Sequence, residues 1–423
     1  MKHSEIRQHL TFITYRKLIA VSLFIGFLAA FLAITLKRLT EHYENAFIIN
    51  TENNAIFLVI FPFFGLSVIH FLRLYLFRNK DNKGITEIFE STRSKTKNLP
   101  LYKIPSHFIN GLLTVIFGGS TGIEVSTVVA SATIGSFAQQ KENVFRKYKT
   151  ELVSAGVAAG VTALFCSPAA GILFAYEVIA RKPSKIFFLT TVTALAMACG
   201  LLFIANEQPL FALTINTWHY HAIPYFVLLG VLSGIHSVYL TKSVILFKSQ
   251  FAKIEVYFHR IILGAVILSG CLFLFPQLYG DGYHSVKTIL FSSGGQILTL
   301  NFALTLVGIL LLKPIVTSVT LASGGDGGIF APSLFLGAFV GLFTAVILNT
   351  FFDAGVIPIN FMVLGMAAML SASIHAPFTA LFLVCGIIGD YTLFFPILVI
   401  CLISKFTAKQ IFPYTVYTFS AAK

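Results

Sequence analysis

The chain alternates long apolar runs with short polar connections, and the first run, residues 18–36, is long enough to span a bilayer. It follows a basic segment, residues 1–17. For a signal peptide the run is too long, and no small-residue cleavage site follows it. Basic residues also recur in later connections, a bias typical of cytoplasmic loops. We therefore predict a cytoplasmic N-terminal segment, 1–17, followed by a first membrane helix.

Several later apolar runs are interrupted by glycine, serine and proline, at residues 118–122, 166–171, 323–332 and 371–377. Broken helices are tolerated at membrane depth only where their backbone is buried in protein or lines a wet cavity. The pattern therefore predicts an all-α polytopic membrane protein with short and broken helices.

Composition supports a membrane protein, because 56% of the residues are hydrophobic and only 11% are charged. A net charge of +13 would suggest nucleic acid as partner of a soluble protein. Here the basic residues sit in the connections, so we expect the lipid bilayer and no nucleic acid. The five cysteines lie in apolar runs without metal-ligand spacing, so we expect no metal and no cofactor.

An internal repeat is the strongest sign of organisation. One shift places residues 118–135 on 324–341, and a nearly equal shift places 156–168 on 365–377. Matching pairs include Gly118/Gly324, Gly122/Gly328, Gly135/Gly341, Gly156/Gly365 and Pro168/Pro377. We predict two related halves, 18–205 and 206–423. Paired broken segments in two halves indicate a transporter binding site near the bilayer midplane, here at 118–126 and 324–332.

Each of these two segments is a glycine turn that leads into an apolar helix. A helix start offers unpaired N–H groups and a positive dipole end, so two starts that converge bind an anion without a full charge. Glu124 stands where the second segment has Phe330. When ionised it would compete with an anion, and when protonated it would withdraw, as a gate and proton carrier. The alternative is a cap on a neighbouring helix.

At these positions the sequence resembles the CLC family of chloride channels and chloride/proton exchangers, over most of the chain. The resemblance is carried by GGIFAP (327–332), GDGYHSV (280–286), AAGILFAYEV (169–178) and AAMLSASIHAPFTALFLV (367–384). It implies an inverted repeat of two halves built from short, tilted and broken helices, and a homodimer with one anion pathway per subunit. It also implies an external gating glutamate in a G-x-E-G-P motif. Glu124 in GIEVS matches that glutamate, whereas Val125 and Ser126 replace the Gly-Pro.

The same resemblance implies the residues that contact the anion: Gly328, Ile329, Phe330 and Ala331 in GGIFAP, and Lys83, Gly84 and Ile85 in NKGITE (82–87). Lys83 takes the place of the family's anion-binding serine. Either it turns into the pathway, or it snorkels to cytoplasmic water, which we favour. The family's pathway tyrosine would be Tyr414, with Tyr417 as second choice, unless it is an interfacial anchor.

In family exchangers a glutamate at the position of Val178 accepts protons from inside, while family channels have valine there. We therefore expect passive conduction, and a structural role for the adjacent Glu177 as partner of nearby cations. Lys313 is expected to snorkel to an interface. With little chain after residue 405, we expect a short form without CBS regulatory domains, in a bacterial inner membrane.

The leading hypothesis is transport of chloride or a similar small monovalent anion. The first alternative is a proton-coupled antiporter of chloride or fluoride with a different proton route. An intramembrane enzyme with Ser126 or His375 in its chemistry is a third reading, but the sequence has no nucleophile and base at recognisable spacing. We therefore expect no enzyme.

Overall fold

The computed structural model describes residues 2–78, 80, 82–94, 96–142, 145–180, 182–292 and 299–422, and in this part the regular structure is helical. One isolated antiparallel bridge joins Gly122 and Gly328. The all-α prediction is confirmed. Eight of the described helices are long and apolar enough to cross a membrane.

The first part of the chain forms eight α-helices: α1 (Lys2–Asn53), α2 (Phe57–Phe71), α3 (Ile85–Arg93), α4 (Lys103–Ile116), α5 (Glu124–Ala138), α6 (Lys149–Phe165), α7 (Pro168–Phe174) and α8 (Lys185–Ala205). A π-helical stretch, Ala175–Ala180, extends α7.

The remaining helices of the described chain are α9 (Ile223–Ala252), α10 (Tyr257–Leu274), α11 (Tyr283–Ser292), α12 (Leu300–Ala322), α13 (Phe330–Phe352), α14 (Pro358–Ile374), α15 (Pro377–Ile388), α16 (Phe394–Ile411) and α17 (Val416–Ala422).

The first helix is longer than its apolar run predicts. It begins at Lys2 and ends at Asn53, so neither residue 17 nor residue 36 is a helix boundary. At 1.5 Å per residue its 52 residues are about 78 Å long, more than twice the hydrocarbon thickness. Its last part, beyond Leu36, therefore reaches the polar site described below.

The two repeat segments have the same local structure. Helix α6 is followed by Cys166 and α14 by His375, and both of these capping residues have a left-handed backbone conformation. The next helix begins with proline in each case, α7 at Pro168 and α15 at Pro377. Proline suits the first helical turn because the backbone N–H groups of that turn have no acceptor within the helix, so the N–H that proline lacks is not needed. His375 thus terminates a helix.

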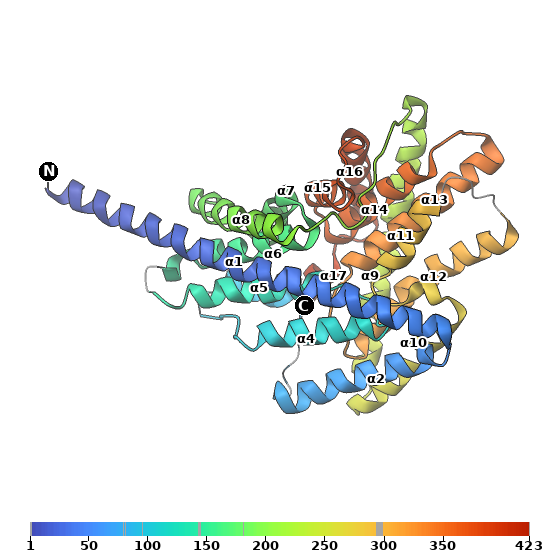
Figure 1. Ribbon diagram of the computed structural model, residues 1–423, viewed down its shortest axis with the longest axis horizontal. Helices are drawn as coiled ribbons and strands as arrows, with labels where there is room; N and C mark the ends of the chain where they lie inside the picture. Colours follow the sequence, from blue (N-terminus) through green and yellow to red (C-terminus); the bar gives the residue numbers. More distant parts are fainter. Residues whose placement is uncertain are drawn as a thin grey trace.

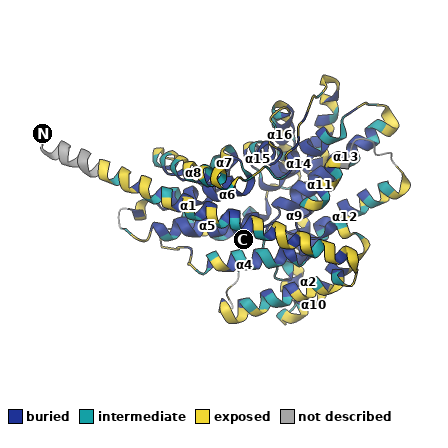
Figure 2. Cartoon of the chain, viewed as in Figure 1, coloured by how far each residue is buried: buried dark blue, intermediate teal, exposed yellow. Residues whose placement is uncertain are grey.

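The most buried helices form two closely packed pairs, α5 with α6 and α13 with α14, and Figure 1 places these helices inside the bundle. In α13, the helix after the second glycine turn, residues on every side are buried. Figure 2 shows exposed residues concentrated on outer helices such as α1, α8 and α10. The glycine turns 118–123 and 324–329 thus lie inside the bundle, where broken backbone is shielded from lipid.

Candidate functional site

Segments that are far apart in the sequence meet at a central cavity of about 70 Å³. They are the turn before α3, the start of α5, the turn before α13 and the start of α17, joined by one residue each of α9 and α12. The lining residues include Lys83, Gly84, Val125, Gly328, Ile329 and Tyr417. The structure therefore brings together NKGITE, GIEVS and GGIFAP, and their helices α3, α5 and α13 direct positive dipole ends to one place.

Three of the predicted anion-contacting residues lie just outside this lining, in the first turns of their helices. Ile85 begins α3, and Phe330 and Ala331 begin α13, all of them buried. Their backbone, rather than their apolar side chains, belongs to the helix starts that face the cavity.

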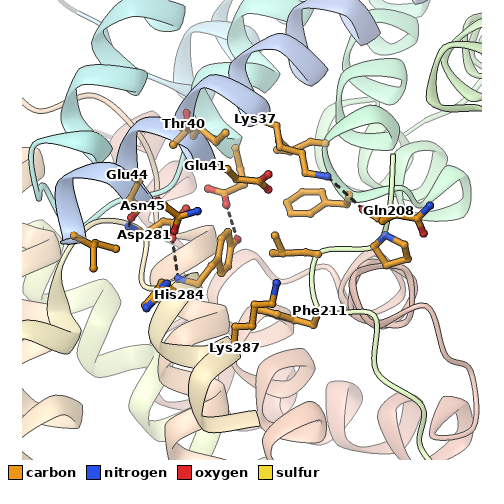
Figure 3. Close-up of a pocket in the computed structure, with 18 of the residues that line it drawn as sticks. Lys37, Thr40, Glu41, Glu44, Asn45, Gln208, Phe211, Asp281, His284 and Lys287 are labelled. Atoms are coloured by element: carbon orange, nitrogen blue, oxygen red, sulfur yellow. Dashed lines mark hydrogen bonds between the residues drawn. The ribbon is translucent and has the colours of Figure 1, made fainter. Parts of the chain in front are cut away.

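A second, larger cavity lies on the other side of Glu124, which we call the vestibule. Its volume is about 640 Å³, and it is lined by α1, α11 and the connection after α8. Figure 3 shows ionisable side chains from several elements around it, among them Lys37, Glu41, Glu44, Asp281, His284 and Lys287. Glu52 and Glu207 also line this cavity.

Glu124 stands in the wall between the two cavities. It lines the vestibule, while the next residue, Val125, lines the central cavity. The Glu124 side chain is 1% exposed and lies between the two glycine turns. A Cβ placed on Gly122 would overlap with Glu124 Oε2 and lie 2.7 Å from the Cβ of Ala331. The carboxylate therefore occupies the space where the starts of α5 and α13 meet.

The two oxygens of this carboxylate have different surroundings. Oε1 accepts a hydrogen bond of 2.6 Å from the Tyr283 hydroxyl. Oε2 faces the start of α13 and makes no hydrogen bond of standard geometry within the described chain. The Tyr283 hydroxyl and the two helix dipoles offset part of the cost of burying the ionised carboxylate, and no full positive charge holds it in place.

Val125 and Ser126, which replace the family's Gly-Pro, are accommodated by glycines on neighbouring segments. The Val125 side chain packs where Gly328 has no Cβ, and it also contacts Gly84. A Cβ on Gly111 of α4 would lie 2.8 Å from the Cβ of Ser126. The larger residues of α5 thus fill space that these three glycines leave.

Lys83 lines the mouth of the central cavity with an exposed side chain. Its backbone N–H donates to Glu87, a residue of α3 that also forms a 2.8 Å ion pair with the buried Lys103. The Lys83 amide is therefore engaged by protein, and the exposed ammonium agrees with snorkelling, which stays a prediction.

The predicted pathway tyrosine Tyr414 does not line the central cavity. Its side chain is 42% exposed and its ring packs near Phe412 and Phe419. Tyr417, the second choice, is 8% exposed and lines the cavity. The reason is the break after α16: the chain is extended from Phe412 and turns inward only where α17 begins. The Tyr417 hydroxyl lies beside Ile329 without a standard hydrogen bond in the described chain.

Glu177 and Val178 lie in the π-helical stretch after α7. Val178 is buried, and Glu177 accepts hydrogen bonds from the backbone N–H and the hydroxyl of Thr379, at 2.8 and 2.6 Å. Thr379 belongs to the first turn of α15, so Glu177 caps that helix. The partner of Glu177 is thus a helix start rather than the cations we expected.

One further acidic residue, Asp326, lines the central cavity from the second glycine turn. Its Oδ2 accepts a 2.5 Å hydrogen bond from Asn82 and lies 3.1 Å from Nδ1 of the buried His107. Oδ1 accepts the Gly327 N–H at 2.9 Å. These contacts tie the turn before α13 to α4 and to the turn before α3.

Two residues at the site were not predicted from the sequence. Tyr283 lies in GDGYHSV, but its partner Glu124 is far away in the sequence, and no local spacing indicates their contact. Lys248 lines the central cavity from α9 with an exposed side chain. Its position near the polar end of a long apolar helix was the available signal.

Apolar helices with glycine turns that meet at a buried cavity are the architecture of helical membrane transporters. The sequence profile described as "voltage gated chloride channel" matches residues 64–409, and the chain belongs to this family, the CLC family. The resemblance stated from the motifs is confirmed.

Curated relatives carry related names. The "H(+)/Cl(-) exchange transporter ClcA" of Vibrio cholerae serotype O1 is 29% identical over 323 residues, which cover 70% of this chain and 64% of that protein. The "voltage-gated ClC-type chloride channel ClcB" of Escherichia coli O17:K52:H18 is 26% identical over 74% of each chain. The chain thus spans less than two thirds of the length of the first of these relatives.

Solved structures share the fold. A slow cyanobacterial Cl⁻/H⁺ antiporter superposes with a TM-score of 0.80 and 20% identity, covering 95% of this chain and 96% of that one. A CLC-type fluoride/proton antiporter gives a TM-score of 0.76 and 23% identity, covering 95% and 97%. These similarities extend the fold assignment beyond the motifs to almost the whole chain.

Proposed function

We propose that this protein carries chloride or a similar small monovalent anion across a membrane, through a pathway gated by Glu124. The observation that carries the proposal is the position of the Glu124 carboxylate, between two helix starts and between two cavities. An anion that reaches the same helix starts must compete with the carboxylate. Protonation removes the competing charge, so the side chain can withdraw.

Conduction in this proposal is passive. Val178 has no proton to accept or donate, and Glu177 is engaged in capping α15. The second candidate is proton-coupled antiport of chloride or fluoride by another proton route. It is favoured by the names of the relatives, which include an H⁺/Cl⁻ exchange transporter and a fluoride/proton antiporter.

The assembly and orientation we propose follow the family resemblance. The protein forms a homodimer with one pathway per subunit, lies in a bacterial inner membrane with its N-terminus in the cytoplasm, and opens its vestibule to the outside. Two related halves, divided near residue 205, form each pathway. No nucleic acid and no cofactor takes part, and the protein is not an enzyme.

The direct test is flux from chloride-loaded proteoliposomes, with external chloride and external pH recorded together. We expect chloride to leave without a matched uptake of protons. A fixed proton-to-chloride ratio that persists against a chloride gradient would favour the antiporter. If chloride stays inside, vesicles loaded with fluoride decide between another anion and no transport.

Lys83→Ser tests whether the lysine enters the pathway. We expect the chloride flux to change by less than about threefold, because a solvent-exposed, screened charge contributes little to binding. The same flux assay at low and high salt measures it. A much larger loss, or a change in preference between chloride and fluoride, would place the ammonium on the ion path.

A further inference from the structure

Tyr283 is the side chain that holds the gate in its observed position. Its hydroxyl donates to Glu124 Oε1 at 2.6 Å, and its ring packs edge-on against Phe211, with 5.9 Å between centroids. Of the carboxylate's two oxygens, only the one that Tyr283 contacts has a standard hydrogen bond in the described chain. The tyrosine is half-buried at the start of α11 and lines the vestibule.

The turn before Tyr283 is built around a buried lysine. Lys313 of α12 is 0% exposed, so the expectation that it snorkels to an interface is wrong. Its ammonium donates to the carbonyl oxygens of Leu278 and Gly280, at 3.1 and 3.2 Å. It also lies 4.4 Å from the ring centroid of Phe335. A buried ammonium requires such partners, and here they belong to the turn that carries Tyr283.

Two acids complete the support of this turn. The backbone N–H of Asp281 donates to Glu44 Oε1 of α1 at 3.1 Å, and the backbone N–H of Tyr283 donates to Asp281 Oδ1 at 2.8 Å. Gly280 and Gly282 have positive φ values of 57° and 86°. The turn is therefore fixed by α1 and α12 together, and the phenol is presented to Glu124 by rigid elements.

We propose that Tyr283 is the latch of the gate: its hydroxyl retains the ionised Glu124 carboxylate between the two glycine turns and loses its hold when the carboxyl group is protonated. The inference rests on the proposed function. A hydrogen bond to a charged acceptor is roughly twice as strong as one to a neutral acceptor, so the contact favours the closed, ionised state. Tyr283 acts as a positioning residue.

Other ionisable groups surround the same carboxyl group. From the elements that enclose it and the vestibule, these are Tyr417 of α17, Asp281 before α11, His284 and Lys287 of α11, Lys37, Glu41, Glu44 and Glu52 of α1, and Glu207 after α8. Lys37 is paired with Glu207 at 2.9 Å. Among the described residues, Tyr283 makes the one side-chain hydrogen bond to the Glu124 carboxylate, so removing its hydroxyl changes a single contact of the gate.

Tyr283→Phe tests the latch in chloride-loaded proteoliposomes over a series of external pH values. Without the hydroxyl the ionised carboxylate is less stable, so it is protonated at a higher pH. We expect the pH of half-maximal flux to rise by about one unit, the size expected when one charge-assisted hydrogen bond is lost, and the maximal flux at acid pH to stay unchanged.

Two matched variants make the result decisive. Tyr239→Phe removes a hydroxyl that donates to the Leu311 carbonyl at 2.9 Å. Tyr239 does not line the vestibule, so this variant should keep the wild-type dependence of flux on pH. In Glu124→Gln, adding Tyr283→Phe should have no further effect. Thermal unfolding of each purified variant shows whether it is folded.

The outcomes separate the latch from the proposed function. If Glu124→Gln abolishes the pH dependence but Tyr283→Phe retains the wild-type profile, the latch is wrong and the gate stands. If Glu124→Gln itself keeps the wild-type profile, the gate is wrong, and the latch with it. A shift of equal size in Tyr239→Phe would also overturn the latch.

Discussion

Glu124→Gln should produce a pathway that conducts at every external pH. The amide has the shape of the carboxyl group but no charge, so it competes with an anion for the helix starts no better than protonated Glu124 does. At neutral pH we expect a chloride flux well above wild type, about tenfold for each pH unit between the assay pH and the midpoint of the wild-type profile, because the ionised carboxylate that competes with the anion is absent. Flux from proteoliposomes over a pH series measures this.

A vestibule variant provides the control. Glu41 is exposed and lines the vestibule, but no bond joins it to Glu124 in the described chain. Glu41→Gln removes one negative charge from the same cavity and should keep the pH dependence. A flat, low flux in Glu124→Gln would mean that the carboxylate is required for transport rather than blocking it, and a wild-type profile would mean that it is no gate.

The sequence predicts the core of this fold because each close contact between helices requires a small residue at its own position. Gly122 and Gly328 are paired by the repeat and joined in the structure by the isolated bridge. Gly135 and Gly341, also paired by the repeat, both occur at helix crossings where a Cβ would overlap with a carbonyl oxygen. Because each close helix contact requires a small residue, glycines recur at matching positions of the two segments, and this pattern can be recognised in the sequence.

The candidate site was predictable as far as it depends on helix starts. Glycine turns before apolar runs mark those starts, and Glu124 is conspicuous as a carboxylate in such a place. Tyr414 shows where the prediction from sequence fails. The point at which the chain turns inward after α16 depends on packing, and Tyr417, three residues further along, lines the cavity in place of Tyr414.

The sequence alone also does not show how deeply a charged residue such as Lys313 is buried in the bundle. Lys313 sits before a proline in an apolar helix, a pattern compatible with an interfacial lysine. Its partners are carbonyl groups of a distant turn and the ring of Phe335, and no spacing rule links them. Contacts between elements, rather than the periodicity of one element, decide whether such a charge is buried.

Gly365→Ala should destabilise the protein more than its single methyl group suggests. A Cβ on Gly365 would overlap with the carbonyl oxygen of Gly337 in α13, and backbone atoms cannot rotate away as a side chain can. Overpacking a close crossing costs about 3 kcal/mol, since the two helices must separate along their contact. We expect a clear fall in the thermal unfolding temperature of the protein in detergent.

The same substitution should also reduce transport, because α13 carries at its start the glycine turn that faces Glu124. Gly200→Ala and Gly270→Ala are the matched controls, because both lie in helices and the added Cβ would meet no atom of another helix within 4 Å. Alanine is the better helix former by about 1 kcal/mol, so these two variants should unfold at the wild-type temperature or slightly above it. An equal loss of stability in all three would show that helix conformation, rather than the α13–α14 crossing, sets the cost.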